Sequence, residues 1–295
     1  MQAIEFFNRY TQSIETESVY GENFLKWTYH NPFGKIALHS FVKRPFFSTW
    51  YGNRMNQPKS KQKILPFIEK YQLDAREFIK KPSEFSHFND FFYRQLTPQS
   101  RPTASSAIVF PADGRHLGFQ KASEISGVFV KGQSWNLTEL LASQELAKKY
   151  KDGSLVLSRL CPVDYHRFHF PCEGTPSPTK EIQGPLFSVS PIALRKQLSY
   201  LWQNKRTITE LKTPHLGSVL IIEIGATCVG SIKQSYRADQ IVDKGQEKGY
   251  FQFGGSSTIT IFEPNRIQLA QDLLEHSSKQ RELYARVGDS MGETL

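Results

Sequence analysis

The sequence predicts an α+β protein with a mainly helical N-terminal region, a β-rich core and a helix near its C-terminal end. Two observations support this prediction. Within residues 1–100, apolar side chains recur at helical spacing, as at Ile64, Phe67, Ile68 and Tyr71. From about residue 105, the pattern changes to short runs of β-prone residues separated by Gly and Pro. We therefore divide the chain into residues 1–100 and residues 101–295.

The individual elements follow from the same patterns. In the first region, the helical spacing of residues 64–71 continues through Leu73, Phe78 and Ile79. In the second region, five runs have β character: 107–110, 127–130, 155–157, 219–224 and 257–262. Residues 265–287 return to helical spacing directly after Pro264, a residue that often begins a helix.

The bulk composition indicates an ordinary folded protein, with 39% hydrophobic and 22% charged residues. The three cysteines are an odd number without C-x-x-C spacing, which disfavours a disulfide framework or a structural zinc site. The sequence contains no run of 18 apolar residues and does not open on a basic, then apolar, leader. We therefore expect a protein of the cytoplasm without a spanning helix.

The formal net charge of +9 predicts an anionic partner, either nucleic acid or an acidic lipid surface. Residues 41–51, FVKRPFFSTWY, combine Lys43 and Arg44 with five large aromatic side chains, a composition suited to the headgroup boundary of a bilayer. Packing within a helical layer explains the same composition equally well. No nucleic-acid-binding motif is recognisable, so the lipid surface is the favoured partner.

A Gly-Ser junction precedes the last predicted strand. In residues 250–262, YFQFGGSSTITIF, two glycines and two serines stand directly before a β-prone run. Such clusters usually mark a turn into a strand. However, Gly255 has no Cβ to shield its carbonyl, so the hydroxyl of Ser256 could attack it if a base were nearby.

Two histidines are candidates for that base. His166 and His169 lie three residues apart in DYHRFHFPCEG, with Arg167 between them. Positions three apart face opposite sides of an extended strand, and no third ligand has suitable spacing, so we expect no metal site. Acid–base or anion-binding work is the favoured interpretation, although a histidine is often simply structural.

An aspartate completes the set. Asp113 lies in PADGR, directly after a short apolar run, where Asp-Gly most often marks a turn. With a histidine and a serine elsewhere in the chain, Asp113 could instead orient His169, which would deprotonate Ser256.

These clusters together resemble the phosphatidylserine decarboxylase family. Further segments similar to family motifs occur in family order: FFYRQLTPQSRP at 91–102, GPLFSV at 184–189, GATCVGSI at 225–232 and KGYFQFGGSS at 248–257. The resemblance extends from about residue 91 to the end of the chain. Residues 1–90 match by helical and aromatic character rather than by motif.

The resemblance implies a proenzyme that cuts itself between Gly255 and Ser256 into residues 1–255 and 256–295. Asp113, His169 and Ser256 match the self-processing triad, and His166 matches the histidine that handles substrate and proton during decarboxylation. Ser256 would become a covalent pyruvoyl group, that is, pyruvate in amide linkage to the chain. No separate cofactor would then be needed. Its ketone would form a Schiff base with the amine of phosphatidylserine and accept electrons as CO2 leaves, which yields phosphatidylethanolamine.

The resemblance further implies a homodimer that acts as a peripheral protein on the cytoplasmic face of an anionic membrane. Two alternatives remain open. A relative that decarboxylates a soluble amino acid would keep every motif. A non-enzymatic basic protein that binds membranes or nucleic acid would leave the Gly-Ser junction and the two histidines without a purpose.

Overall fold

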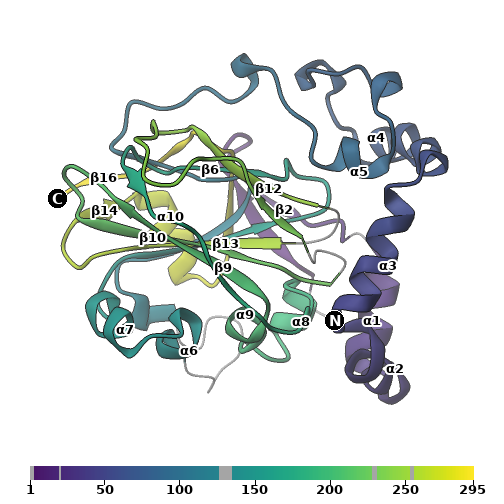
Figure 1. Ribbon diagram of the computed structural model, residues 1–295, viewed down its shortest axis with the longest axis horizontal. Helices are drawn as coiled ribbons and strands as arrows, with labels where there is room; N and C mark the ends of the chain where they lie inside the picture. Colours follow the sequence, from purple (N-terminus) through teal and green to yellow (C-terminus); the bar gives the residue numbers. More distant parts are fainter. Residues whose placement is uncertain (1–2, 20, 126–134, 228–230, 253–255) are drawn as a thin grey trace.

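A ten-stranded sheet forms the centre of the molecule in the computed structural model, which describes residues 3–19, 21–125, 135–227, 231–252 and 256–295 (Figure 1). The strands run in the order β2-β1-β15-β4-β5-β13-β10-β9-β7, and β8 also pairs with β9. Neighbouring strands are antiparallel except for the parallel pair β1 and β15. The strands of this sheet are β1 Glu5–Asn8, β2 Ser13–Thr16, β4 Gly114–Phe119, β5 Leu155–Leu160, β7 Thr175–Pro176, β8 Lys180–Ile182, β9 Arg206–Lys212, β10 Ser218–Ile224, β13 Ser256–Phe262 and β15 Glu282–Ala285.

The central strand β13 is buried along its whole length. Its sequence, SSTITIF, is rich in β-branched residues, which fit a pleated surface packed on both faces. It pairs with β5 on one side and β10 on the other, and the first register pair on the β5 side joins Ser256 to Leu160. The strand predicted at 257–262 is therefore confirmed, with Ser256 as an additional first residue.

Apolar side chains cover both faces of the main sheet. On β13, Ile259 and Ile261 pack in one core cluster with residues of the helices α6 to α9, whereas Phe262 packs in a second cluster on the opposite face. The second cluster joins the main sheet to α10 and to strands of the three-stranded sheet β14-β16-β3. Another three-stranded sheet has the order β11-β12-β6. These smaller sheets comprise β3 Ile108–Val109, β6 Arg167–His169, β11 Ile232–Gln234, β12 Glu247–Phe251, β14 Ile267–Leu269 and β16 Ser290–Thr294.

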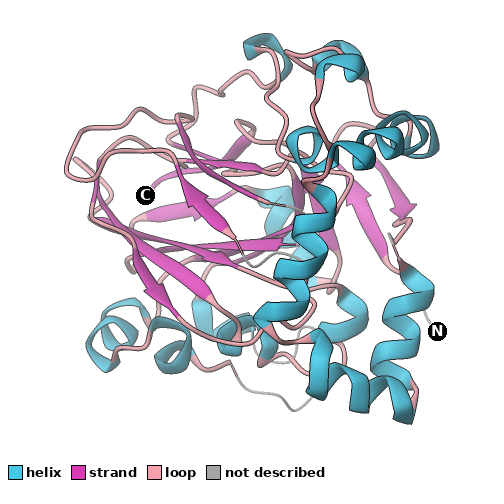
Figure 2. Cartoon of the chain, turned by 45° about the vertical axis from the view of Figure 1, so that its right-hand side comes forward, coloured by secondary structure: helices cyan, strands magenta, loops and turns pink. Residues whose placement is uncertain are grey.

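Helices surround the strands, as Figure 2 shows. The N-terminal ones stand at one end of the sheet, at the right of Figure 1, and include a π-helical stretch at Leu38–Val42. The helix α2 begins where Asn31 accepts a hydrogen bond from the backbone N–H of Phe33 and Pro32 takes the first helical position. The helices are α1 Glu22–His30, α2 Pro32–Ala37, α3 Pro45–Met55, α4 Ile64–Tyr71, α5 Phe88–Phe92, α6 Leu137–Leu141, α7 Gln144–Tyr150, α8 Pro191–Leu194, α9 Tyr200–Gln203 and α10 Gln271–Ser278. No helix within the described ranges is long and apolar enough to span a bilayer.

The helical prediction for residues 1–100 holds for α1 to α5 but is wrong at two places. Residues 5–8 and 13–16 form strands, because β1 finds a parallel partner in β15 that local spacing cannot reveal. The predicted continuation through Leu73, Phe78 and Ile79 is also wrong. The helix α4 ends at Gln72, whose φ of 52° is left-handed, and Phe78 instead bridges to Leu96.

The C-terminal prediction was partly wrong for a related reason. The helix α10 covers only the middle of residues 265–287, and it ends before Gln280, which has a φ of 56°. Apolar residues flank it on strands, with Ile267 and Leu269 on β14 and Leu283 on β15. Strands predicted at 107–110, 155–157 and 219–224 are confirmed as β3, β5 and β10. The run at 127–130 lies outside the described residues.

Candidate active site

The four candidate residues lie at the ends of strands. Ser256 is the first residue of β13, and Asp113 directly precedes β4. His169 is the last residue of β6, and His166 directly precedes that strand. Gly255 lies outside the described residues, so the predicted cleavage junction is placed on its serine side alone.

A small apolar cluster brings these strand ends into one region. Its buried members are Ala112, Leu160, Phe168 and Phe251. Leu160 is the register partner of Ser256, and Ala112 is the neighbour of Asp113. The approach of these segments is close, because a Cβ on Gly114 would stand 2.5 Å from the carbonyl oxygen of Arg159. Residues far apart in the sequence are thus gathered at one end of the central strands.

His169 has the environment of a neutral base. Its Nδ1 lies 2.9 Å from the carbonyl oxygen of Gly245, which can only accept, so Nδ1 carries the proton and Nε2 has the free lone pair. Nε2 is buried and has no hydrogen-bond partner among the residues the structure describes. Burial lowers the pKa of His169, against the opposing effects of the Gly245 hydrogen bond and of the charges on Glu247 and Asp113. The imidazole can therefore accept a proton at neutral pH.

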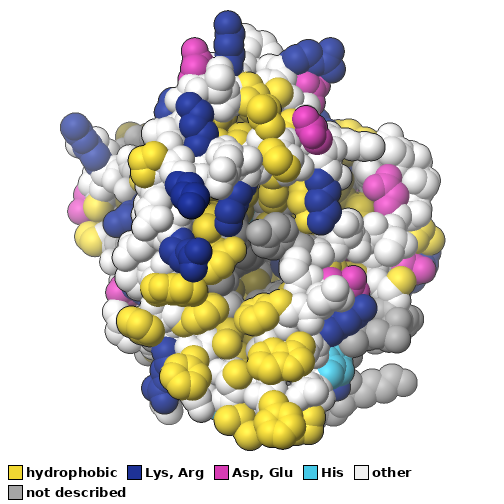
Figure 3. Space-filling view, turned by 90° about the vertical axis from the view of Figure 1, so that its right-hand side faces the viewer, with side chains coloured by type: hydrophobic (Ala, Val, Ile, Leu, Met, Phe, Trp, Pro, Cys, Tyr) yellow, Lys and Arg dark blue, Asp and Glu magenta, His cyan; other side chains and the backbone are white. Residues whose placement is uncertain are grey.

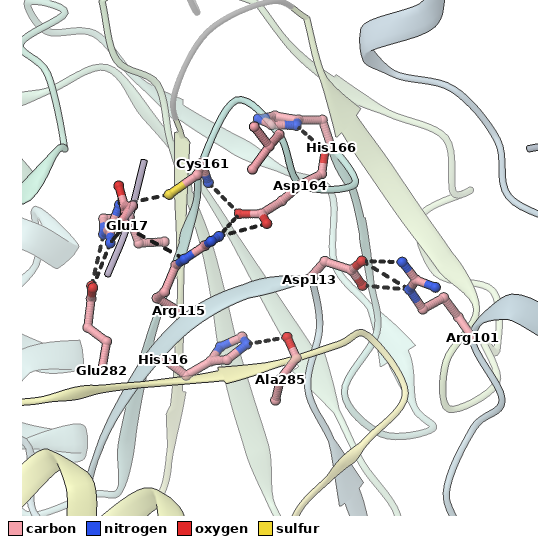
Figure 4. Close-up of polar contacts among 12 residues, drawn as sticks. Glu17, Arg101, Asp113, Arg115, His116, Cys161, Asp164, His166, Glu282 and Ala285 are labelled. Carbon is pink, nitrogen blue, oxygen red and sulfur yellow. Dashed lines mark hydrogen bonds and ion pairs between the residues drawn. The ribbon is translucent and has the colours of Figure 1, made fainter. Parts of the chain in front are cut away.

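Asp113 is held by other partners than His169. Its carboxylate accepts from Arg101 Nη2 at 2.6 Å (Figure 4) and from the backbone N–H of Val287 at 2.9 Å. It is 2% exposed, and no hydrogen bond joins it to His169 within the described ranges. Asp113 is thus a nearby charge that favours the protonated form of His169, a smaller effect on its pKa than that of burial, and not the direct hydrogen-bond partner that the triad would suggest.

Ser256 combines complete burial with an unused hydroxyl. The residue is 0% exposed, and its Oγ has no hydrogen-bond partner in the described part of the chain. A buried polar atom without a partner costs free energy, and such atoms concentrate at functional sites. The hydroxyls of Ser257, Thr258 and Thr260 on the same strand also have no partner among the described residues, so this finding leaves Ser256 Oγ available as a nucleophile without singling it out.

His166 faces a different set of groups. It is 0% exposed, its Nδ1 lies 3.0 Å from the carbonyl oxygen of Asp164, and its ring centroid is 3.9 Å from that of Phe92. The two histidines therefore bond to different carbonyls and are not arranged as a shared metal site.

Three arginines of this region were missed by the sequence analysis. Arg115 binds the carboxylate of Asp164, as Figure 4 shows, Arg101 binds Asp113, and Arg94 donates to the carbonyls of Val163 and Asp164. Arg94 and Arg101 stand within FFYRQLTPQSRP, a segment already noted as similar to a family motif. The motif pointed to these arginines, but the sequence did not indicate what they bind.

An apolar pocket of about 410 Å³ adjoins the site. One wall is formed by Phe24 and Leu25 of α1 and by Phe47, Trp50 and Tyr51 of α3. The other side is formed by residues that follow or end β5 and by residues near α8: Arg159, Leu160, Cys161, Pro162, Ser188, Val189 and Ser190. Because Leu160 is paired with Ser256, the pocket reaches the strand that carries the candidate nucleophile.

The inner end of this pocket is ionic. Arg159 binds Glu17 Oε2 at 2.5 Å and Glu282 Oε2 at 2.6 Å, and its Nη1 donates to Cys161 Sγ. Although burial alone would raise it, the charge of Arg159 lowers the pKa of Glu17 to about 2. Burial raises the pKa of the Cys161 thiol, so Cys161 is not a thiolate nucleophile at neutral pH. The network ties the N-terminal strands to β5 and β15.

The mouth of the pocket opens beside a group of exposed apolar side chains on the N-terminal helices, visible in the lower half of Figure 3. We call this group the apolar patch; it consists of Phe24, Trp27, Phe33, Ile36, Phe41, Phe46 and Trp50. Phe24 and Trp50 belong to both the patch and the pocket wall. Basic residues of these helices and of the turn before α3 accompany it: Lys26, Lys35, Lys43, Arg44 and Arg54.

The fold and site define an α+β protein with a buried serine at the start of its central strand, one buried and one half-buried histidine and an adjoining apolar pocket. The family model for phosphatidylserine decarboxylase matches residues 88–293. Curated relatives extend the match to almost the whole chain. The phosphatidylserine decarboxylase proenzyme of Fusobacterium nucleatum is 44% identical over 99% of this chain and 98% of that protein. The proenzyme of Clostridium botulinum is 40% identical over 99% of this chain and 99% of that protein. The proenzyme of Desulfitobacterium hafniense is 41% identical over 98% of this chain and 98% of that protein. The chain belongs to the phosphatidylserine decarboxylase family.

Proposed function

We propose that this protein is a self-processing phosphatidylserine decarboxylase, cut between Gly255 and Ser256, that converts phosphatidylserine to phosphatidylethanolamine and CO2. Family membership supports the reaction. The observation that carries the site assignment is the buried Oγ of Ser256, which makes no hydrogen bond within the described ranges, in the same region as His169, whose pKa burial lowers.

In the cutting step, His169 Nε2 takes the proton of Ser256 Oγ, and Oγ attacks the carbonyl carbon of Gly255. The C–O bond forms and the peptide C–N bond breaks, so the proton passes to the freed amine and an ester links the two segments. Loss of the Ser256 α-proton then breaks the Cβ–Oγ bond. Gly255 leaves as a carboxylate, and hydrolysis of the remaining enamine releases ammonia and leaves a ketone at residue 256.

A pyruvoyl group fits the position of Ser256. The residue is fully buried between β5 and β10, and its one side-chain polar atom makes no hydrogen bond within the described ranges, so conversion to a ketone would break no such bond. When present, this group supplies an electron sink for decarboxylation. His166 lies in the same region, and we assign to it the proton that replaces the lost carboxylate.

The apolar patch gives this function a peripheral membrane location. Phe41 and Phe46 are 67% and 77% exposed, whereas Val42 and Ser48 are buried, so residues 41–51 pack on one side and present aromatic rings to solvent on the other. Exposed aromatics flanked by Lys and Arg suit the boundary of an anionic bilayer. Because two patch residues also line the pocket, a lipid headgroup would pass from the bilayer to the site without crossing water. The predicted homodimer and the cytoplasmic face remain predictions.

The mass of the purified protein under denaturing conditions tests the central proposal. The wild-type protein should yield two chains, residues 1–255 and 256–295, and the smaller one should resist Edman degradation because a ketone replaces its amine. Ser256→Ala should remain one inactive chain near 33.9 kDa.

Ser257→Ala is the matched control. Ser257 is equally buried and its Oγ is also unbonded in the described part of the chain, but it points to the opposite face of β13. It should still be cut and active. Two chains from Ser256→Ala would refute the assignment. Cutting accompanied by CO2 release from free amino acids, with none from phosphatidylserine vesicles, would instead favour a soluble substrate.

A further inference from the structure

Arg94 is a buried cation that binds backbone rather than acid. It is 5% exposed, and its guanidinium carbon lies 5.0 Å from the ring centroids of both Phe78 and Phe91. Its Nη2 donates to the carbonyl oxygens of Val163 at 3.3 Å and Asp164 at 3.4 Å. Neither Nε nor Nη1 makes a hydrogen bond within the described ranges. Burial lowers the pKa of Arg94 to about 10, so the side chain stays charged at neutral pH.

A buried charge without a carboxylate in direct contact costs stability, so its placement needs a reason. The two carbonyls that Arg94 binds belong to the turn before His166. The second of them, the carbonyl oxygen of Asp164, also lies 3.0 Å from Nδ1 of His166. One oxygen therefore accepts from both the arginine and the histidine.

This shared oxygen fixes the tautomer of His166. A carbonyl cannot donate, so Nδ1 must carry its proton, and Nε2 is left as the nitrogen that exchanges protons. The carbonyl is itself held, because the Asp164 carboxylate binds Arg115 Nη1 at 2.7 Å and accepts from the backbone N–H of Cys161 at 2.6 Å. The turn is anchored by its side chain on one side and by Arg94 on the other.

Phe92 fixes the plane of the same imidazole. Its ring centroid lies 3.9 Å from that of His166, with 40° between the planes. Phe92 and Arg94 stand two residues apart at the end of α5, so one short segment controls both the ring and the carbonyl behind it.

We propose that Arg94 and Phe92 are positioning residues for decarboxylation: Arg94 holds the Asp164 carbonyl that sets the tautomer and direction of His166, and Phe92 holds its ring plane. The inference rests on the proposed role of His166 in turnover. It assigns neither residue to the cutting step, in which His169 is the base.

A cavity beside Arg94 allows a chemical rescue experiment, in which a solute replaces the guanidinium that an Arg94→Ala change removes. Arg94 lines a cavity of about 360 Å³, together with Asp113, Val163 and Asp164. In an Arg94→Ala variant, a small guanidinium from solution could enter this cavity and occupy the vacated place. Urea has a similar shape without the charge and serves as the solute control.

The experiment measures cutting, kcat and KM on phosphatidylserine in mixed micelles. Arg94→Ala should be cut like the wild type and keep its KM within about twofold, while kcat falls roughly 10- to 100-fold, as expected when a catalytic group is misplaced. Millimolar methylguanidinium should restore kcat several-fold and urea should not. Arg94→Lys, which keeps the charge but loses the planar donor fork, should fall between the two.

Arg206→Ala is the matched control, because Arg206 is also a buried arginine, 4% exposed, that donates to backbone carbonyls, those of Leu140 and Glu139. It should keep kcat and show no response to methylguanidinium. For the ring contact, Phe92→Leu should lower kcat, whereas Phe85→Leu, at a residue 1% exposed in the same core cluster, should not.

The outcomes separate the inference from the function. A wild-type protein that releases no CO2 would refute the proposed function. Three results would overturn the inference alone. The Arg94→Ala variant could be cut and keep the wild-type kcat, or it could stay uncut. Its kcat could also fall by an amount that Arg206→Ala shares and that methylguanidinium does not restore. If Arg94→Ala does not fold, the comparison of Phe92→Leu with Phe85→Leu decides, and equal kcat values would overturn the inference.

Discussion

At the scale of single residues, the two histidines differ in what they bond rather than in how far apart they stand. His169 has a buried Nε2 without a hydrogen bond to any described residue and belongs to the region of Ser256, whereas His166 is tied to the turn at Asp164. We therefore expect His169→Ala and Asp113→Asn to accumulate uncut chain. His166→Ala should be cut normally and decarboxylate at least 100-fold more slowly, in the range for loss of an acid–base group. Denaturing gels and CO2 release measure the two steps separately.

The reverse pattern, with cutting lost in His166→Ala and kept in His169→Ala, would overturn the assignment. If both variants stayed uncut, the histidines would act as one unit in processing. Asp113→Asn needs its own reading, because it also breaks the ion pair with Arg101. Arg101→Gln should match its cutting defect if Asp113 acts through its position, and should be milder if Asp113 acts through its charge on His169.

A third histidine, His116, should make the free energy of unfolding depend on pH. His116 is 0% exposed, its ring bonds Ser158 and the carbonyl of Ala285, and burial lowers its pKa to about 3. Above pH 6.5, both folded and unfolded states hold it neutral. Below that pH the unfolded chain takes up a proton that the folded chain refuses, so the free energy of unfolding should fall by up to about 1.4 kcal/mol per pH unit down to pH 3.

Urea unfolding of the uncut Ser256→Ala chain between pH 7.5 and 4.5 measures this slope on a single chain. Adding His116→Asn should reduce the slope by close to one proton, even if it also lowers stability at pH 7.5. His215→Asn, at an exposed position, should leave the slope unchanged. An unaltered slope in the His116 variant would show that other groups carry the acid sensitivity.

At the scale of elements, the sequence pattern predicted those strands whose formation depends mainly on neighbouring residues. The central strand β13 and its neighbours β5 and β10 were predicted because β-branched runs bounded by Gly and Pro leave little choice. The strands β1 and β15 were missed, since they are short and pair with each other across nearly the whole sequence. Their stability comes from tertiary contacts that no window of neighbouring residues contains.

The site follows the same division. Sequence and resemblance identified Asp113, His169 and Ser256 as candidates for self-cutting, and the strand ends that carry them lie beside one apolar cluster. The partners of these groups could not be predicted. Arg101 on Asp113 and Arg94 behind His166 are contacts across a fold, and nothing in the spacing of FFYRQLTPQSRP indicates which carbonyl or carboxylate each arginine meets.

At the scale of the whole molecule, the apolar patch, the pocket and the central strand form a continuous series. The patch lies on α1, α2, the π-helical stretch and α3, which stand at one end of the sheet (Figure 1), and its side chains gather on the face shown in Figure 3. The pocket wall shares Phe24 and Trp50 with it, and the pocket reaches Leu160, the partner of Ser256. A surface of this kind on a water-soluble monomer would be unfavourable unless it is covered, and a bilayer that holds the substrate is the covering that the proposed function supplies.

This arrangement predicts that removing apolar side chains from the patch detaches the protein from membranes without damaging the site. Phe33, Phe41 and Phe46 are 75%, 67% and 77% exposed, and each inserted ring would contribute roughly 2 kcal/mol. The triple change to Ser should therefore abolish flotation with vesicles that contain phosphatidylserine. It should leave cutting intact and raise the apparent KM on vesicles far more than on dispersed short-chain lipid.

Replacing Lys35, Arg44 and Arg54 by Gln should remove the salt-sensitive part of binding, about 1 kcal/mol for each charge. Ile241→Ser is the control, because Ile241 is 81% exposed but lies outside the patch. Unchanged flotation of the triple variant would refute docking through the patch, and equal, salt-independent binding of the wild type to neutral and anionic vesicles would refute its electrostatic part.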